Sequence, residues 1–165
     1  GAVLPVVYGA SAAALLAAMD RHRPDAVVAL GVAVGRRAVT PERVAVNLDD
    51  SASPDNDGVV HSETAVVDGG PVGRFSTLPV RAIADAIEAA GIPATVSGTA
   101  GGFVCNHVFY RLMAATEGTG VPAGFVHVPG LPGQGDPTED GPGMELDAMV
   151  RAITIALEVV AASLA

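Results

Sequence analysis

Short apolar runs alternate with segments of helical periodicity along this chain of 165 residues. Runs rich in β-branched residues predict strands, and apolar residues three or four positions apart predict helices. The predicted strands are residues 2–8, 26–30, 42–48, 93–97 and 123–128. The predicted helices are residues 10–22, 77–90, 106–115 and 144–164. This alternation favours the α/β class, with an open, mostly parallel twisted sheet and helices on both faces, an α/β/α sandwich.

Two stretches between these elements have little periodicity. Residues 49–74 are dense in Gly, Pro and Asp, and because so long a connection is uncommon in a compact domain, we interpret it as a functional loop or lid. Residues 131–143 form a second loop, rich in Pro and Gly. Residues 26–30 are apolar throughout, which predicts a central strand buried on both faces.

The helix predicted over residues 77–90 has signals at both ends. Ser76 or Thr77 is expected to cap its N-terminus, and Pro79 stands in its first turn, where a missing N–H costs least. Gly91 follows its last residue, as expected for a position that adopts the left-handed conformation at a helix end.

Composition and charge narrow the function classes. A chain of 165 residues suits one domain with a single core. The net charge of −9 argues against nucleic acid or an anionic membrane as a partner, and no apolar run is long enough to span a bilayer. A single cysteine excludes an internal disulfide framework and predicts a cytoplasmic location. The four scattered histidines give no zinc-ligand spacing.

The only cysteine, Cys105, stands where a predicted strand passes through a Gly-rich loop into the helix over residues 106–115. Free N–H groups and the dipole at a helix N-terminus favour a thiolate. A thiolate there is a candidate nucleophile, and the same amides are able to hold a developing oxyanion. The alternative is that Cys105 is a small buried apolar side chain. Active sites of open α/β sheets lie at the carboxyl ends of strands, which favours the nucleophile.

His127 lies near the end of the apolar strand over residues 123–128. A cysteine nucleophile needs a base within hydrogen-bond reach, and imidazole is the usual base at neutral pH. His107, two residues after Cys105, is expected on a different face of its helix. We therefore take His127 as the partner of the cysteine. The alternative is an ordinary strand-end histidine whose hydrogen bonds are satisfied locally.

Glu42 is the third candidate and begins the strand predicted over residues 42–48. A carboxylate at this place is able to orient an imidazole and to stabilise its charged form. The alternative is a surface glutamate in a salt bridge with Arg36, Arg37 or Arg43. The residue types alone favour this alternative.

Four motifs in this chain occur together and in a fixed order. They are Thr-Pro-Glu-Arg-Val-Ala-Val-Asn at 40–47, Pro-Asp-Asn-Asp-Gly at 54–58, Phe-Val-Cys-Asn-His-Val-Phe-Tyr at 103–110 and Gly-Phe-Val-His-Val-Pro at 124–129. With the Gly-rich loop at 31–36 and Thr-Leu-Pro at 77–79, they resemble the signatures of the pyroglutamyl peptidase I (pyrrolidone-carboxylate peptidase) family. The resemblance extends over nearly the whole chain.

This resemblance implies an α/β fold in which residues 1–165 form a single catalytic domain that removes an N-terminal pyroglutamate from peptides. It implies that Cys105 is the nucleophile, His127 the base and acid, and Glu42 the orienting carboxylate. It further implies no metal or organic cofactor, a cytoplasmic location, and a homo-oligomer, either a tetramer or a dimer. The implied substrate-binding residues are Phe103, which packs on the lactam ring, Val104 and Val32.

Three departures from the family pattern bear on activity. The family's first strand and the aromatic loop that closes over the substrate have no counterpart here, and we expect such residues to exist beyond the printed sequence. Val32 replaces the usual Gln, at a position where the resemblance implies a contact with the substrate through the backbone. Ala52 stands in a stretch, residues 51–54, that lacks the Arg usually found before the Pro-Asp-Asn motif, which would slow the enzyme or alter its specificity.

Two other functions stay open. A homologue with an incomplete pocket would act as a binding or assembly protein, and an amidase of altered specificity would keep the triad and take a different small amide. No Gly-x-Ser-x-Gly elbow supports a serine hydrolase. Residues 31–36 lack the Gly-x-Gly-x-x-Gly fingerprint of a dinucleotide site.

Overall fold

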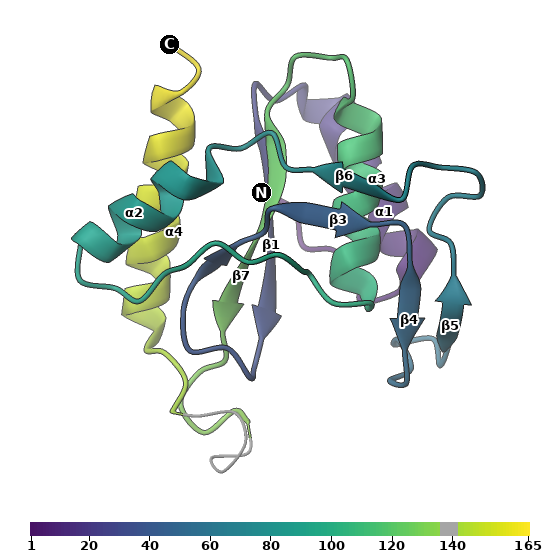
Figure 1. Ribbon diagram of the computed structural model, residues 1–165, viewed down its shortest axis with the longest axis horizontal. Helices are drawn as coiled ribbons and strands as arrows, with labels where there is room; N and C mark the ends of the chain where they lie inside the picture. Colours follow the sequence, from purple (N-terminus) through teal and green to yellow (C-terminus); the bar gives the residue numbers. More distant parts are fainter. Residues whose placement is uncertain (136–141) are drawn as a thin grey trace. The chain divides into compact units, whose positions relative to one another are not determined.

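Figure 1 shows the computed structural model, which describes residues 1–135 and 142–165. The helices in these residues are α1 (Tyr8–His22), α2 (Val80–Ala89), α3 (Val104–Thr116) and α4 (Leu146–Ala162). The strands are β1 (Val27–Ala33), β2 (Thr40–Pro41), β3 (Val44–Val46), β4 (Asp49–Ser51), β5 (His61–Thr64), β6 (Gly73–Phe75) and β7 (Ala123–Pro129). The chain divides into two compact units. Unit 1 comprises Gly1–Val27, Val44–Ser76 and Thr99–Ala123, and unit 2 comprises Val28–Arg43, Thr77–Gly98 and Gly124–Ala165.

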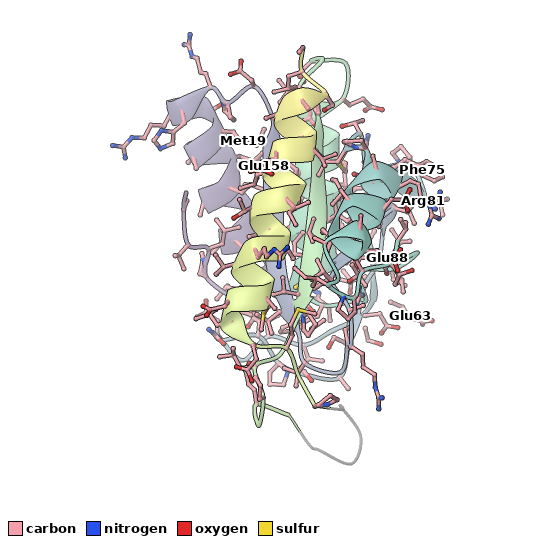
Figure 2. All side chains as sticks on the ribbon, turned by 90° about the vertical axis from the view of Figure 1, so that its left-hand side faces the viewer. Met19, Glu63, Phe75, Arg81, Glu88 and Glu158 are labelled. Atoms are coloured by element: carbon pink, nitrogen blue, oxygen red, sulfur yellow. The ribbon has the colours of Figure 1, made fainter. Side chains whose placement is uncertain are left out.

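A three-stranded sheet in the order β1–β7–β2 lies at the centre of unit 2. β1 and β7 run in the same direction (Figure 1), whereas β2 pairs antiparallel with β7 and places Thr40 opposite His127. α2 and α4 pack against each other, and α4 lies in front of the sheet in the view of Figure 2. Among the described residues, four helices and a mixed open sheet confirm the predicted α/β class.

The helix α3 is the centre of unit 1. It contacts α1 and the strands β3, β4 and β6, and its apolar residues Val108, Phe109 and Leu112 are buried. β3 pairs antiparallel with β6, and β4 pairs antiparallel with β5 (Figure 1). The helix that carries the cysteine is therefore a core element with little freedom to shift.

The predicted helices are present, and α1 begins two residues earlier than its apolar pattern indicates. Its N-cap, Val7, makes no side-chain cap hydrogen bond. The backbone N–H of Tyr8 donates instead to Oδ2 of Asp55 at 3.1 Å, across 47 positions of the chain. A carboxylate far away in the sequence thus accepts one of the N–H groups that a helix start leaves without a partner in the helix. A local sequence signal cannot reveal such a distant acceptor.

The expected cap of α2 is wrong. The N-cap is Pro79 and no side chain caps the helix, which begins at Val80. The hydroxyl of Ser76 donates to the carbonyl of Ala123 at 3.3 Å, so it is used by a tertiary contact. The predicted stop is confirmed, because Gly91 directly follows the C-cap with a φ of 79°, which favours glycine.

The strand predicted over residues 2–8 is absent. No strand pairs with this segment among the described residues, and the carbonyl of Val6 accepts from the N–H of Asn56. A strand exists only through a partner, and Pro5 has no N–H to offer one. Residues 8 onwards belong to α1.

The strand predicted over residues 26–30 is present as β1 but is not buried on both faces. Val27 and Ala29 are buried, whereas Leu30 and Val32 on the opposite face are 51% and 54% exposed. β1 stands at the edge of its sheet and β7 occupies the centre. An apolar run therefore indicated a strand correctly but placed it wrongly within the sheet.

The strand predicted over residues 93–97 is reduced to two isolated parallel bridges, Val39 with Ala94 and Glu42 with Ser97. Pro41, which has no N–H to donate, lies between the two bridges and interrupts the ladder. The predicted strand over residues 42–48 is likewise shorter, as β3.

The irregular connection predicted over residues 49–74 is wrong, whereas the functional role expected for this stretch stays a prediction. This stretch contains β4, β5 and β6, and the turn between β4 and β5 is built around Asp55, whose carboxylate accepts the N–H groups of Asp57 and Val59. Aspartate side chains that bond to nearby N–H groups stabilise tight turns. Of the loop predicted over residues 131–143, residues 136–141 lie outside the described part of the chain.

Candidate active site

His127 lies on β7, the central strand of the sheet in unit 2, and is 3% exposed. Its ring lies against the ring of Phe125, two positions earlier on the same face, with the ring centroids 4.8 Å apart. Such packing restricts the ring to one orientation. The predicted role needs an oriented imidazole, and the strand supplies it.

Glu42 is fully buried, although the residue types alone favoured a surface position. Its backbone N–H donates to the carbonyl of Phe125 at 2.8 Å, and a parallel bridge joins it to Ser97. Its carboxylate oxygen Oε1 lies 2.8 Å from Nδ1 of His127. Because a carboxylate only accepts hydrogen bonds, Nδ1 is the protonated nitrogen and Nε2 is left for acid–base work.

Arg36 belongs to the same group. Its guanidinium Nη1 donates to Oε1 of Glu42 and to the hydroxyl of Thr40. The salt bridge that was the alternative role for Glu42 is therefore present together with the contact to His127, and the two do not exclude each other. Burial and paired charges make this carboxylate a structural part of the site.

Cys105 lies in the first turn of α3, one residue after its start, and is partly exposed. This confirms the predicted position at a helix N-terminus, where free N–H groups favour a thiolate. The N-cap is Phe103, which makes no side-chain cap hydrogen bond. A partly exposed thiol does not fit the alternative of a buried apolar side chain.

Asn106 fixes this turn of α3 to the strand beside it. Its side-chain amide donates to the carbonyls of Val46 and Leu48, both at 2.9 Å, and its carbonyl oxygen accepts the N–H of Val46 at 3.0 Å. Asn106 is fully buried. Three hydrogen bonds made by the residue next to Cys105 therefore fix the position of this turn relative to β3.

Sequence reasoning missed a second buried pair beside the cysteine. Nδ1 of His107 lies 2.7 Å from Oδ2 of Asp49, and both residues are buried. Tyr8 packs edge-on against His107, Phe103 and His61. Asp49 stands five positions before the Pro-Asp-Asn stretch and carried no sequence signal of its own, because its partner is 58 positions away.

The surroundings of Tyr8 change the acidity of its phenol. Burial raises the pKa of Tyr8 above its ordinary value of 10.0, and the nearby carboxylates of Asp49, Asp55 and Asp50 raise it further. Tyr8 therefore stays a neutral phenol at physiological pH. Within the described residues, its hydroxyl and Oδ1 of Asp49 have no hydrogen-bond partner.

The predicted substrate-binding residues lie in different surroundings. Phe103 is partly buried against Tyr8, and Val104 is buried in the first turn of α3. The side chain of Val32 borders an apolar groove of about 440 Å³ in unit 2. Ala52, where the usual Arg is lacking, is exposed after β4. The groove is lined mainly by Leu30, Val32, Leu146, Met149, Val150 and Ile153.

In residues 1–135 and 142–165, no group of three or more His, Cys, Asp or Glu side chains is arranged to hold a metal ion. No helix in the same residues is both long enough and apolar enough to cross a membrane.

An α/β fold with a cysteine at a helix N-terminus and a buried histidine–glutamate pair defines a class of protein suited to nucleophilic and acid–base chemistry. Comparison with known proteins identifies the family within this class. The profile of the family described as pyroglutamyl peptidase matches residues 1–163. The chain belongs to this family, which confirms the resemblance found in its motifs.

Individual relatives and solved structures agree with this family assignment. The chain is 53% identical to a pyrrolidone-carboxylate peptidase of Gloeobacter violaceus, over 94% of this chain and 77% of that protein. It is similar in structure to pyroglutamyl peptidase I of Bacillus amyloliquefaciens, with a TM-score of 0.91, 40% identity and coverage of 96% and 78% of the two chains. For the pyrrolidone carboxyl peptidase of Thermococcus litoralis the TM-score is 0.92 with 36% identity, over 98% and 77%.

Proposed function

We propose that this chain is a cysteine exopeptidase that hydrolyses the amide bond after an N-terminal pyroglutamate, with residues 1–165 acting as one catalytic domain. The observation that carries the proposal is the buried hydrogen bond between His127 and Glu42 in a member of the pyroglutamyl peptidase family. It fixes the tautomer that a base needs, and α3 supplies a nucleophile of matching type, Cys105.

The reaction proceeds in two steps. The thiol of Cys105 gives its proton to Nε2 of His127, and the thiolate attacks the carbonyl carbon of the amide that follows the pyroglutamyl ring. Backbone N–H groups at the start of α3 hold the oxyanion. The carbon–nitrogen bond breaks, His127 gives its proton to the leaving amine, and a thioester remains. Water then loses a proton to His127 and attacks the thioester, which releases pyroglutamate and restores the thiol.

The substrate is a neutral lactam, so its site needs apolar contacts and a few backbone hydrogen bonds. Phe103 is the proposed packing partner of the ring, because it is partly exposed two residues before Cys105. Val104 and the backbone of Val32 are the proposed further contacts. Glu42 keeps the imidazole of His127 oriented and stabilises its charged form. The proposed reaction uses no cofactor.

A homo-oligomer, tetramer or dimer, and a cytoplasmic location belong to the same proposal. The apolar groove beside Val32 supports an oligomer, because exposed apolar patches of this kind mark interaction surfaces. The single cysteine supports a reducing compartment. Gel filtration with light scattering measures the mass in solution.

The deciding experiment is the hydrolysis of a pyroglutamyl-coumarin amide by the purified chain, beside the variants Cys105→Ser and His127→Gln. An alanyl-coumarin amide tests whether the lactam is required, and His22→Gln, an exposed histidine at the end of α1, is the matched control. We expect turnover of the first substrate only, its loss in both site variants and its retention in the control.

Two results would contradict the proposal. Turnover of the alanyl amide at an equal rate would point to an amidase of different specificity. No turnover by a sample that is folded by circular dichroism, with Cys105 reactive toward iodoacetamide, would point to a binding or assembly protein that has kept the appearance of the site.

A further inference from the structure

We propose that Arg36 is a positioning residue of this active site, which compensates the charge of the Glu42 carboxylate and holds it oriented toward His127. Its Nη1 donates a hydrogen bond to Oε1 of Glu42, the same oxygen that accepts from Nδ1 of His127. One oxygen thus joins a permanent cation to the proposed base. This inference rests on the proposed function, in which His127 takes up and releases a proton in every cycle.

Burial makes such a cation necessary. The side chain of Glu42 is 0% exposed and that of His127 is 4% exposed. A carboxylate removed from water to this degree is costly unless a charge and hydrogen bonds compensate it. Within the described residues, its second oxygen, Oε2, has no partner. The compensation therefore comes through Oε1, from Arg36 and His127.

The two donors differ in what they can supply. His127 is neutral when it is ready to accept a proton and positive after it has done so, so it cannot offset the charge of Glu42 at every stage. Arginine stays protonated under all conditions relevant to proteins. Arg36 thus compensates the carboxylate in both protonation states of His127, and the Nδ1–H bond to Glu42 persists through the cycle.

The position of Arg36 is also fixed independently of Glu42. Its guanidinium donates to the hydroxyl of Thr40, which is 6% exposed. Thr40 pairs in register with His127 across the antiparallel strands β2 and β7. One guanidinium nitrogen, Nη1, therefore connects the strand position opposite the base with the carboxylate that orients it. The rigid plane of the guanidinium fixes the directions of these N–H groups, whereas a lysine ammonium on a flexible stem leaves them free to rotate.

The test compares Arg36→Ala, Arg36→Lys and the control Arg37→Ala, whose residue is the exposed neighbour in the chain. Steady-state kinetics with pyroglutamyl-coumarin amide separate kcat from KM. Methylguanidinium at a sub-denaturing concentration is added to Arg36→Ala, because the 23% exposure of the Arg36 side chain gives a small cation access. The proton NMR signal of the His127 Nδ1–H, assigned by its absence in His127→Gln, reports the bond to Glu42 directly.

In Arg36→Ala we expect kcat to fall about 10- to 100-fold, the equivalent of one hydrogen bond to a charged group, with KM nearly unchanged. We expect the Nδ1–H signal to move or broaden, and methylguanidinium to restore part of both. Arg36→Lys should lie between, since it keeps the charge and loses the fixed direction of the Nη1 N–H groups, and Arg37→Ala should match the wild type. A role limited to stability would not produce rescue by a small cation.

The proposal is overturned if kcat and the Nδ1–H signal of Arg36→Ala both match the wild type. It is equally overturned if activity falls while the signal is unchanged and methylguanidinium restores nothing. Should the wild type not hydrolyse the substrate, the proposed function fails, yet the NMR comparison still tests whether Arg36 holds the Glu42–His127 bond. The two failures are therefore distinguishable.

Discussion

Cys105 and the pair formed by His127 and Glu42 are held by different kinds of interaction. In unit 1, the turn that carries Cys105 is fixed by neutral hydrogen bonds from Asn106 to the backbone of Val46 and Leu48. In unit 2, His127 and Glu42 are fixed by charge, with Arg36 on the same carboxylate oxygen. Cys105 is partly exposed, whereas the carboxylate of Glu42 is fully buried.

This difference fits the roles that we propose for the two groups. A thiol that attacks a substrate has to reach it, so the protein restrains the backbone around it and leaves the sulfur accessible. An imidazole that changes its charge in every cycle needs a constant electrostatic environment, which buried charges provide. We therefore expect substitutions around Cys105 to act mainly on stability, and substitutions around His127 to act mainly on kcat.

The largest effect is expected for Glu42→Gln. An amide of the same size does not favour one histidine tautomer, and loss of a triad carboxylate lowers kcat by about 10⁴-fold in a serine protease. We expect a loss of about 10³-fold or more in kcat here, measured with pyroglutamyl-coumarin amide, and a KM close to that of the wild type. The control is Glu88→Gln, because Glu88 lies exposed on α2 (Figure 2). A loss below about tenfold would mean that Glu42 does not orient the base.

The next effect is on stability, in Asn106→Ala. This change removes three hydrogen bonds and takes the side-chain partner from the partly buried N–H and carbonyl of Val46 and from the carbonyl of Leu48. We expect the free energy of unfolding to fall by about 2–4 kcal/mol, measured by urea denaturation. Asn56→Ala, at an exposed position, should change it little. A similar small change in both variants would contradict the view that Asn106 fixes the Cys105 turn.

A smaller loss is expected for Gly102→Ala, in the loop before Cys105. A Cβ at this position would lie 2.2 Å from the carbonyl oxygen of Asp50, and the two backbones are joined there by the Asp50 N–H and the Gly102 carbonyl. We expect a destabilisation of about 1–3 kcal/mol, with a fall in the alkylation rate of Cys105.

Gly9→Ala is the matched control for this loop, because a Cβ on Gly9 would meet nothing within 4 Å in the first turn of α1. Its stability should stay equal or rise slightly, since alanine favours helices. Equal behaviour of the two variants in thermal denaturation would show that the close approach at Gly102 is not limiting.

The smallest expected effect is a change in the stability of the fold at acidic pH. Burial alone would raise the pKa of the Asp55 carboxyl, but the N–H groups of Val59, Tyr8 and Asp57 outweigh it and hold the pKa below its ordinary value of 3.8. A lowered pKa in the folded state stabilises the fold at pH values above the ordinary pKa, and this contribution is lost as the pH falls through the lowered value.

Asp55→Asn should therefore be less stable than the wild type at about pH 7, and this difference should shrink at about pH 3. Urea denaturation at both values measures it, with the exposed Asp57→Asn as control. A difference that is the same at both values would exclude the carboxylate charge as its cause.

Much of the site was predictable from local patterns. The apolar periodicity of residues 106–115 and the Gly-rich residues before it placed Cys105 at a helix start, and the structure confirms this position. The motifs around Cys105, His127 and Glu42 indicated the family, which the comparisons confirm. Their roles in catalysis stay predictions, and the experiments above test them.

The predictions that failed concern features that depend on a partner far away in the sequence. The strand predicted over residues 2–8 has the right composition, yet no strand pairs with it among the described residues. The stretch over residues 49–74 has the composition of a loop, yet β4 pairs with β5 inside it and β6 pairs with β3, which precedes it. Strand pairing is decided by contacts between segments, which single-sequence patterns do not contain.

The sequence by itself determined the helices, the position of the cysteine and the family, because these follow from local periodicity and from motifs of contiguous residues. Only the tertiary structure decided that Asp55 caps α1, that His107 pairs with Asp49 and that Arg36 and His127 share one oxygen of Glu42. The physical reason is that a buried charge takes its partner from whatever the fold brings within hydrogen-bond distance. A local sequence pattern does not show which distant residues the fold brings together.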